Sequence, residues 1–299
     1  MAGTVLRARG GEYLVDTDDG ESRSASLRGR LKLEQRTGDR VVAGDRVRIL
    51  LQEDASCTIE HVEERRSQLT RRAPGRGHPR ARVMIANVDQ VVIVVAAARP
   101  EPRLRMIDRF LVLAETNGLP AFVVVNKTDL ADAAGNIARF HPYDLAGYPV
   151  VTTSVIDGHG LEEFRERLCG RESVLAGPSG AGKSSLLNAI EPGLGLRIGA
   201  IGEAAGKGRH TTVTAELIPL SCSGYVGDTP GLREVGLWGV DLDTLDSAFP
   251  EFRPLLGACR FGRSCTHVHE PDCAVREAVT DGQIDAGRFE SYLAMRADE

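Results

Sequence analysis

The sequence contains no apolar run long enough to cross a bilayer. The longest run, VVIVVAAA from Val91 to Ala98, falls well short of the roughly 20 residues that a spanning helix needs. The first residues, MAGTVLRARGGEY, lack the long apolar stretch of a secretory signal. We therefore expect a cytoplasmic protein that makes no contact with membrane.

A strong excess of either charge is also absent, since the formal net charge is −5. The charge is nevertheless uneven, because residues 1–82 hold 17 Lys and Arg against 13 Asp and Glu. Seven arginines fall between Glu63 and Arg82. The Pro and Gly content of this segment fits a solvated linker, whereas its arginines fit an arm that contacts phosphate groups. The sequence leaves both interpretations open.

Cysteine is scarce, with six residues in the chain. Three lie far apart and are expected to be free core thiols: Cys57, Cys169 and Cys222. The other three fall within fifteen residues and have histidines beside them: Cys259, Cys265 and Cys273. This cluster indicates a metal site more than disulfides, because three thiols cannot all pair with one another.

The length of 299 residues and the apolar fraction of 42% predict two or three domains. Over residues 1–65, short strand-like pieces such as TVLRA, EYLVDT, RVRIL and TIEHV predict a five-stranded β-barrel of the oligonucleotide-binding (OB) type. A basic linker is expected over 66–82. Strands and helices then alternate over 83–240, which predicts a mostly parallel sheet with helices on both faces.

A third module is expected over residues 241–299, where the pattern becomes irregular. The stretch DLDTLDSAFPEFRPLL is predicted to be helical, and two short helices are expected after the cysteine cluster.

Residues 177–184, GPSGAGKS, match the phosphate-loop pattern G-x-x-x-x-G-K-[ST] between an apolar strand and a predicted helix. The glycines let backbone N–H groups point at phosphate oxygens, and the helix N-terminus adds a positive dipole. Lys183 is expected to reach the β- and γ-phosphates, and the Ser184 hydroxyl to bind Mg²⁺. The stretch predicts a nucleotide site.

The tetrapeptide NKTD, from Asn126 to Asp129, ends another apolar strand. Guanine presents two adjacent donors that one carboxylate accepts together, whereas adenine presents an acceptor there, so Asp129 favours guanine. In the next strand, VTTSV, the backbone near Thr153 and Ser154 is expected to contact the guanine oxygen.

Two further segments complete a GTPase set. DTPG, from Asp228 to Gly231, matches D-x-x-G, in which the Asp holds Mg²⁺ through water and the Gly N–H meets the γ-phosphate. GKGRHTTV, residues 206–213, offers Thr211 and Thr212 as switch ligands of Mg²⁺, although this pair also fits the start of a strand.

The order of these motifs is reversed, because the base motif precedes the phosphate loop by about fifty residues. With the barrel start, NKTD, GPSGAGKSSLLN, GRHTT, DTPG followed by GLW, and the cysteine–histidine tail, the chain resembles the bacterial ribosome small-subunit-dependent GTPases. That family is circularly permuted. The resemblance covers nearly the whole chain and implies an OB-type barrel, a permuted α/β P-loop GTPase core and a C-terminal helical zinc module.

The resemblance also implies an activity and partners. It implies hydrolysis of GTP to GDP and phosphate in late maturation of the small subunit, with stimulation by that subunit. The partners it implies are GTP or GDP and the small subunit with its 16S rRNA. We expect a monomer. The motifs and the resemblance together predict GTP contacts at Asn126, Lys127, Asp129, Thr153, Ser154, Gly177, Pro178, Ser179, Gly180, Ala181, Gly182, Lys183, Ser184, Ser185 and Gly231. The Mg²⁺ that accompanies GTP is assigned to Ser184, Thr211, Thr212 and Asp228.

The cysteine cluster reads C-x5-C-x-H-x5-C, and three thiolates with an imidazole suit tetrahedral Zn²⁺. The resemblance places one structural zinc ion on Cys259, Cys265, His267 and Cys273, with His269 as the rival imidazole. The chain has one residue more between the first two cysteines than the family pattern.

The catalytic pair is predicted to be His210 and Lys183. Leu232 follows the D-x-x-G motif where many GTPases have a glutamine, and leucine cannot hydrogen-bond to water. His210, beside the switch threonines, is the candidate to position the water, unless it is only a polar switch residue. Two other functions compete: an RNA-binding module that uses guanine nucleotide as a conformational ligand, and an ATPase, against which Asp129 argues.

The permuted order has one further implication, because DTPG is the last core motif before the C-terminal module. We hypothesise that GTP state controls the placement of that module.

Overall fold

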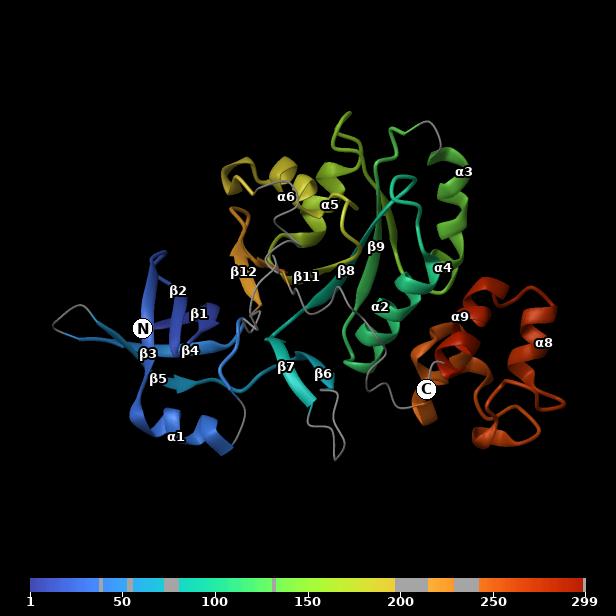
Figure 1. Cartoon of the computed structure of the whole chain (residues 1–299), viewed down its shortest axis with the longest axis horizontal. Coiled ribbons are helices and arrows are strands. Elements are labelled where there is room, and N and C mark those ends of the chain that lie inside the picture. The colour runs from blue at the N-terminus through green and yellow to red at the C-terminus, as the bar shows by residue number, and fades with distance from the viewer. Residues whose placement is uncertain are drawn as a thin grey trace, which may run out of the picture.

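The computed structural model describes residues 1–37, 40–52, 56–72, 81–130, 133–196, 215–228 and 242–297. In Figure 1 they form three parts along the long axis of the molecule: a β-barrel at the left, a helix-covered sheet in the middle and a helical module at the right. No helix in the described ranges has the length and apolar character that a membrane span requires.

Five strands close the N-terminal barrel in the order β1–β2–β3–β5–β4–β1. They are β1 (Ala2–Arg9), β2 (Glu12–Thr17), β3 (Ser22–Leu27), β4 (Arg46–Leu51) and β5 (Cys57–Val62), with α1 (Gly29–Thr37) after β3. The barrel core is apolar, and its fully buried residues include Val5, Val15, Val47 and Ile59. The predicted five-stranded barrel is confirmed.

Six strands continue from the barrel as one sheet in the order β10-β9-β8-β11-β13-β12. The first five run parallel, and β12 pairs antiparallel with β13. They are β8 (Gln90–Ala96), β9 (Ala121–Asn126), β10 (Val150–Thr152), β11 (Glu172–Ala176), β12 (Glu216–Pro219) and β13 (Tyr225–Asp228). Every residue of β8 is buried, as expected of a central parallel strand.

Helices cover both faces of this sheet, as predicted. Alternate residues of β8 pack with α2 (Leu104–Thr116) on one face and with α5 (Leu161–Leu168) and α6 (Lys183–Ile190) on the other. The residues facing α2 are Val91, Ile93 and Val95, and those facing α5 and α6 are Val92 and Val94. The short helices α3 (Ala133–Ile137) and α4 (His141–Leu145) follow β9.

The barrel joins the central sheet through β1 and β12, which pair antiparallel at Arg7 and Glu216. The segment expected as a linker, 66–82, contains strand β6 (Gln68–Arg72) and the start of strand β7 (Ala81–Ala86). The two strands pair as an antiparallel ribbon. Asn117, after the end of α2, accepts hydrogen bonds from the N–H and the hydroxyl of Thr70 at 2.9 and 2.7 Å. These bonds fix the ribbon on the core.

The C-terminal module contains the two expected helices, α8 (Ala274–Thr280) and α9 (Ala286–Ala297). The stretch DLDTLDSAFPEFRPLL does not form one helix. It forms three short 3-10 helices instead, η4 (Leu242–Thr244), η5 (Asp246–Ala248) and η6 (Pro250–Leu255). Pro250 and Pro254 lack a backbone N–H, so they interrupt the hydrogen-bond ladder that an α-helix would need.

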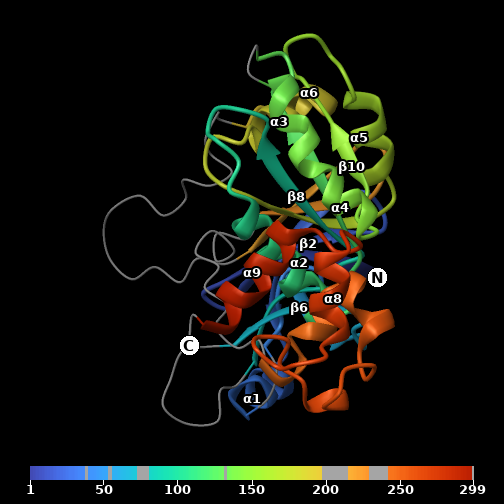
Figure 2. The same ribbon diagram turned by 90° about the vertical axis from the view of Figure 1, so that its right-hand side faces the viewer.

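A buried ion-pair cluster holds this module against α2, and Figures 1 and 2 both show α9 beside that helix. Arg288 of α9 is 3% exposed. Its guanidinium donates to Asp108 of α2 at 2.7 Å and to the two carboxylate oxygens of Glu251 at 2.8 and 3.0 Å. Val112 of α2 is part of the apolar core of the module.

Cys169 and Cys222 form a disulfide, so the expectation that both are free thiols is wrong. The two cysteines are 53 positions apart in the sequence. They are adjacent in space because the segments before β11 and β13, two neighbouring parallel strands, lie side by side. Cys57 is a free and buried thiol, as expected.

Candidate nucleotide site and cysteine cluster

The phosphate loop, residues 177–182, connects β11 to the first turn of α6. Gly177 has a φ of +130°, and a Cβ there would lie 2.0 Å from the Val94 carbonyl oxygen. Gly182 has a φ of +98°, and its Cβ would lie 2.2 Å from Asn126 Nδ2. Only glycine fits these two positions, because any other residue would meet both backbone strain and a clash.

Lys183 opens α6, and its side chain lies inside the loop with 6% of the residue exposed. The ammonium donates to the carbonyl oxygens of Gly177 and Pro178 at 2.7 and 2.9 Å. Ser184, the next residue, is also buried. This places a positive charge and a hydroxyl at the helix N-terminus, where phosphate oxygens and their cation are expected.

The base motif is hydrogen-bonded directly to the phosphate loop. Asn126 Nδ2 donates to the Ala181 carbonyl oxygen at 2.9 Å. The Lys127 ammonium donates to the carbonyl oxygens of Arg99 and Gly180 at 2.5 and 2.6 Å. The backbone of Lys127 has a φ of +65°, a left-handed conformation that is uncommon for a residue other than glycine.

Asp129 lies exposed at the end of this motif, and its carboxylate accepts a 2.9 Å hydrogen bond from the buried Ser154 hydroxyl. The Thr153 hydroxyl donates to Asn126 Oδ1 at 3.2 Å. The backbone N–H of Thr153 donates to the Val125 carbonyl oxygen, and the backbone N–H of Ser154 donates to the His159 carbonyl oxygen. Thr153 and Ser154 therefore hold the base motif through their side chains. The backbone contact to guanine expected near these two residues stays a prediction.

Part of the predicted site lies outside the described residues: His210, Thr211, Thr212, Gly231 and the side chain of Asp228. The backbone of Asp228 is described and ends β13, where it is the register partner of Leu175 in β11. Asp228 thus stands beside the strand that leads into the phosphate loop, a position that suits a Mg²⁺ ligand.

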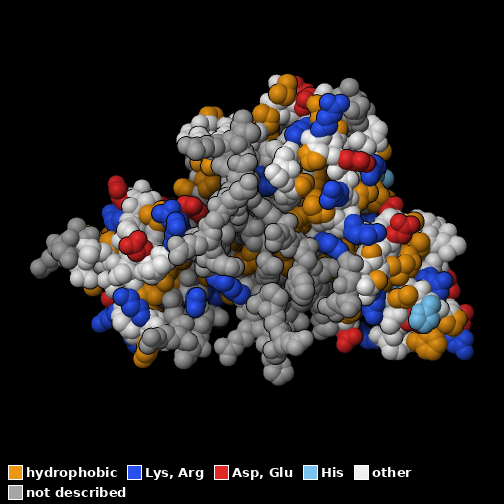
Figure 3. Space-filling model, in the orientation of Figure 1, with side chains coloured by type: hydrophobic (Ala, Val, Ile, Leu, Met, Phe, Trp, Pro, Cys, Tyr) orange, Lys and Arg blue, Asp and Glu red, His pale blue; other side chains and the backbone are white. Residues whose placement is uncertain are grey.

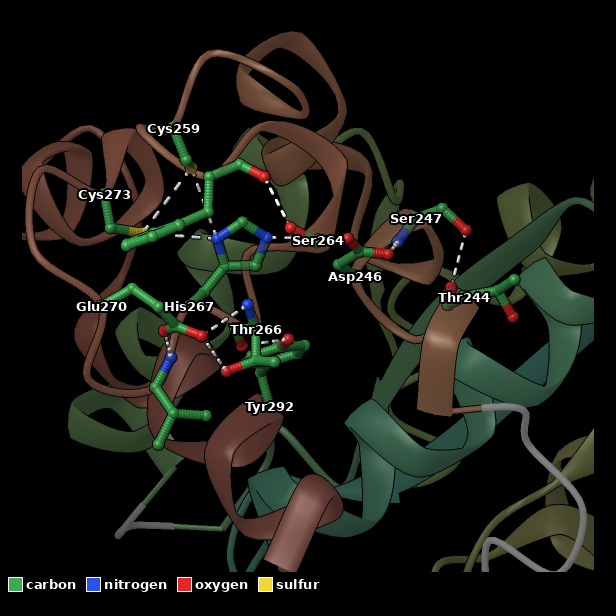
Figure 4. A network of polar contacts seen from close by, with 12 residues as sticks. Thr244, Asp246, Ser247, Cys259, Ser264, Thr266, His267, Glu270, Cys273 and Tyr292 are labelled. Carbon is green, nitrogen blue, oxygen red and sulfur yellow. Dashed lines mark hydrogen bonds and ion pairs between the residues drawn. The ribbon is translucent and has the colours of Figure 1, made fainter.

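Four buried side chains converge in the C-terminal module, three of which are labelled in Figure 4. They are Cys259, Cys265, His267 and Cys273, with ligand atoms all within 4.8 Å of one another. Cys259 Sγ and Cys273 Sγ are 3.8 Å apart, and His267 Nδ1 is 3.6 and 3.3 Å from these sulfurs. Ligands about 2.3 Å from a tetrahedral Zn²⁺ stand about 3.8 Å from one another, so the four residues fit the ion.

The environment of His267 also suits a metal ligand. Its Nδ1 faces the sulfurs, and its Nε2 faces Asp246 Oδ2 at 3.6 Å. Burial lowers the pKa of His267, which favours the neutral ring that binds metals. Burial raises the pKa of the Cys265 thiol to about 12, so a divalent cation is the partner that would hold these sulfurs as thiolates. His269, the rival imidazole, is exposed and outside the cluster.

Two contacts of these sites have no signal in the sequence. The Arg99 carbonyl oxygen, which receives Lys127, belongs to a loop without a motif. Asp246 precedes His267 by 21 positions in an irregular segment, so spacing does not connect them. A carboxylate behind a metal-binding histidine is common, but only the fold identifies which carboxylate it is.

The arginine-rich segment separates into buried and exposed side chains. The Arg65 side chain is 14% exposed and donates to the fully buried Asp45 at 2.7 Å. This ion pair stabilises the barrel. Arg66 is 65% exposed and lies 3.2 Å from Asp89, and Arg82 is exposed. The side chains of Arg71 and Arg72 lie outside the described part. Figure 3 shows Lys and Arg side chains together with Asp and Glu side chains on the visible face of the barrel, at the left.

The sheet order, the phosphate loop and the bonded base motif define a phosphate-loop GTPase with permuted motif order. Two of the solved structures that share this fold cover almost the whole chain. One is described as the crystal structure of YjeQ from Thermotoga maritima, with a TM-score of 0.80, 38% identity and coverage of 99% of this chain and 97% of that chain. The other is described as YloQ, a circularly permuted GTPase, with a TM-score of 0.76, 30% identity and coverage of 99% and 94%.

Sequence comparison then gives the family. The RsgA GTPase model matches residues 62–238. The small ribosomal subunit biogenesis GTPase RsgA of Gemmatimonas aurantiaca is 52% identical over 296 residues, covering 98% of this chain and 96% of the relative. Its counterpart in Moorella thermoacetica is 41% identical over 300 residues, covering 100% and 97%. The chain belongs to the RsgA GTPase family and is a GTP-hydrolysing enzyme.

Proposed function

We propose that this GTPase binds the small ribosomal subunit, acts in its late maturation in the cytoplasm, and hydrolyses GTP faster when bound there. The names of the relatives from Gemmatimonas aurantiaca and Moorella thermoacetica support the assignment to small-subunit biogenesis. The observation that carries the nucleotide part is the pair of bonds from Asn126 and Lys127 to Ala181 and Gly180. They join a guanine-selective motif to a phosphate loop.

In the proposed site, each motif has one task. Asp129 accepts the two guanine donors, and Ser154 keeps its carboxylate oriented. The loop N–H groups and Lys183 bind the β- and γ-phosphates. Ser184, Asp228 and one of Thr211 and Thr212 hold Mg²⁺, which neutralises charge on the phosphates when it is bound.

Hydrolysis is the attack of water on the γ-phosphate. We propose that His210 positions this water, since Leu232 cannot do so. Lys183 and the backbone N–H groups, with Gly231 among them, stabilise the charge that develops on the γ-phosphate oxygens. The protein thus supplies position and electrostatics, and the subunit completes the arrangement.

Cys259, Cys265, His267 and Cys273 are the proposed ligands of a structural zinc ion. Four protein ligands leave no open coordination position, so the ion would stabilise the module without taking part in the reaction. The cluster is integrated with the surrounding core, because Tyr292 of α9 donates to the Thr266 carbonyl oxygen at 2.8 Å.

The barrel and the ribbon β6–β7 are the proposed rRNA-binding parts. A hollow of about 670 Å³ opens where the barrel meets the start of β6, and its lining includes Arg30, His61 and Arg66. Arg30, Arg66 and the exposed Arg82 offer positive charge to rRNA phosphates, and Glu63 and Glu64 also line the hollow. In the proposed division of the chain, barrel 1–65 and segment 66–82 bind RNA, 83–240 binds GTP, and 241–299 carries zinc.

Helix α2 and the loop before it connect the nucleotide site to the C-terminal module. The loop before α2 receives Lys127 of the base motif through the Arg99 carbonyl oxygen. Asp108, one turn into α2, pairs with the buried Arg288 of α9. This connection supports the hypothesis that nucleotide state changes the placement of the module.

The test is phosphate release from GTP, measured for the protein alone, with purified small subunits and with large subunits. We expect small subunits, and not large subunits, to raise the rate of phosphate release. Lys183→Ala should abolish phosphate release. Phosphate release that stays absent with every subunit would overturn the proposal and favour the alternative, an RNA-binding module that uses guanine nucleotide only as a conformational ligand.

A further inference from the structure

The disulfide between Cys169 and Cys222 joins two segments of the GTPase core. Cys169 follows the last turn of α5, and Cys222 lies in the turn between β12 and β13. Their Cα atoms are 5.3 Å apart, and both residues are partly exposed. Cys57, in the barrel core, is buried.

Backbone contacts hold these two segments together without the sulfur atoms. The Gly170 N–H donates to the Ser223 carbonyl oxygen at 2.8 Å, and the Tyr225 N–H donates to the Arg171 carbonyl oxygen at 2.9 Å. Gly224 packs so closely that a Cβ would lie 2.6 Å from both the nitrogen and the oxygen of Arg171. The two cysteines therefore stay adjacent when their bond is broken, and the reduced pair is arranged to close again.

The turn that carries Cys222 is open to small reagents yet held in place. Its neighbours Ser221 and Ser223 are exposed. Glu191, at the end of α6, accepts hydrogen bonds from the N–H and the hydroxyl of Ser221 at 2.9 and 2.7 Å. Cys222 itself packs against the core and is partly exposed, so a low-molecular-weight thiol or disulfide can reach it from the exposed side of the turn, while the turn keeps its conformation.

We propose that Cys169 and Cys222 form a reversible thiol–disulfide site that exchanges with low-molecular-weight disulfides. One cysteine thiolate attacks a sulfur of the small disulfide and releases one small thiolate. The second cysteine thiolate attacks the mixed disulfide, closes the protein disulfide and releases the second small thiolate. The protein pair loses two electrons and two protons, and the small disulfide is reduced to two thiols.

The expected effect of this site is on stability. The bond closes a covalent loop that contains the phosphate loop and α6, and closing a long loop restricts the unfolded chain. The cysteines lie near the start of β11, whereas the phosphate loop follows its end. Oxidation is therefore expected to stabilise the core while leaving nucleotide contacts unchanged, so this inference and the proposed GTPase function fail independently.

The first test incubates the full-length protein with mixtures of reduced and oxidised glutathione, with zinc present, and maps the peptides by mass spectrometry. We expect the linked Cys169–Cys222 peptide to increase with the oxidised fraction and to disappear with excess reduced glutathione. Cysteines that remain thiols at every ratio, or a linked peptide that persists at every ratio, would overturn the reversible site. Cys222→Ser should trap only a mixed disulfide on Cys169.

The second test measures the melting temperature of the oxidised and reduced protein. Reduction is expected to lower it by an amount on the order of 5 °C or more. Cys222→Ser should lose this response to reductant, whereas Cys57→Ser should keep it. Equal melting temperatures for the oxidised and reduced wild type would contradict the stabilising role. A shift that persists in Cys222→Ser would assign the effect to other cysteines.

Discussion

Asn126 and Ala181 are 55 positions apart in the chain, yet Asn126 Nδ2 donates a 2.9 Å hydrogen bond to the Ala181 carbonyl oxygen. In the chain the base motif comes first, but in space it adjoins the phosphate loop, because β9 and β11 flank β8 in one parallel sheet. Parallel strands bring the loops after them to the same edge. The permuted order therefore keeps the base motif beside the phosphate loop and changes which segments lead out of these two loops.

Asp129→Asn should convert the base preference from guanine to xanthine. The substitution replaces one acceptor oxygen with a donor, which meets a guanine donor unfavourably and matches the additional xanthine carbonyl. GTP affinity should fall roughly 10- to 100-fold while XTP affinity rises. Equilibrium binding of both nucleotides measures this. Asp144→Asn, exposed on α4, is the matched control and should change neither. Unchanged GTP affinity in Asp129→Asn would refute the assignment.

His210→Ala should separate binding from turnover. If His210 only positions the water, nucleotide affinity stays at the wild-type value while subunit-stimulated turnover falls by roughly 100-fold. Lys183→Ala should instead lose nucleotide binding. His141→Ala, exposed on α4, is the control for an unrelated histidine. Wild-type turnover in His210→Ala would show that another group positions the water.

Asp246→Asn should weaken zinc binding without removing a ligand. Asp246 lies 3.6 Å from His267 Nε2, so its charge orients the ring and favours metal binding through Nδ1. Competition with a chromogenic chelator should show an affinity lowered roughly 10- to 100-fold. Asp281→Asn, exposed after α8, should bind zinc like the wild type. A zinc affinity of Asp246→Asn equal to that of the wild type would mean that the Asp246 carboxylate has no role at the site.

Local patterns in the sequence predict some parts of this structure and miss others. The phosphate loop and the cysteine cluster are local patterns, and the structure brings the residues of each together. Strand β3, SRSASL, carries no clear strand pattern in the sequence, because only Ala25 and Leu27 of its six residues are buried. The Cys169–Cys222 bond and the Arg288–Asp108 pair depend on which elements become neighbours, and no spacing in the sequence encodes that.

Glu172 should make stability depend on pH. Burial, followed by the negative charge of Asp89, raises the pKa of this carboxyl to about 8, against the opposing effect of Arg66. Between the usual carboxyl pKa and about 8, the folded state keeps a proton that the unfolded state has lost. Stability from this group is therefore fully present at low pH and decreases as pH rises toward 8.

Glu172→Gln removes this titration and tests its sign. The melting temperature of Glu172→Gln relative to wild type should rise between pH 5 and pH 9, by an amount on the order of 5 °C. Glu166→Gln, exposed on α5, should follow the wild type at every pH. A difference between Glu172→Gln and wild type that stays constant with pH would contradict the raised pKa.

We propose that nucleotide state, sensed in the permuted core, controls binding to the small ribosomal subunit through the C-terminal module. The most direct measurement is the affinity of the protein for purified small subunits with a non-hydrolysable GTP analogue and with GDP, in wild type and in Cys265→Ser. We predict that wild type binds roughly tenfold more tightly with the analogue, and that Cys265→Ser loses this difference while keeping its nucleotide affinity. Equal subunit affinity of the wild type in both states, or a full difference in Cys265→Ser, would contradict the account.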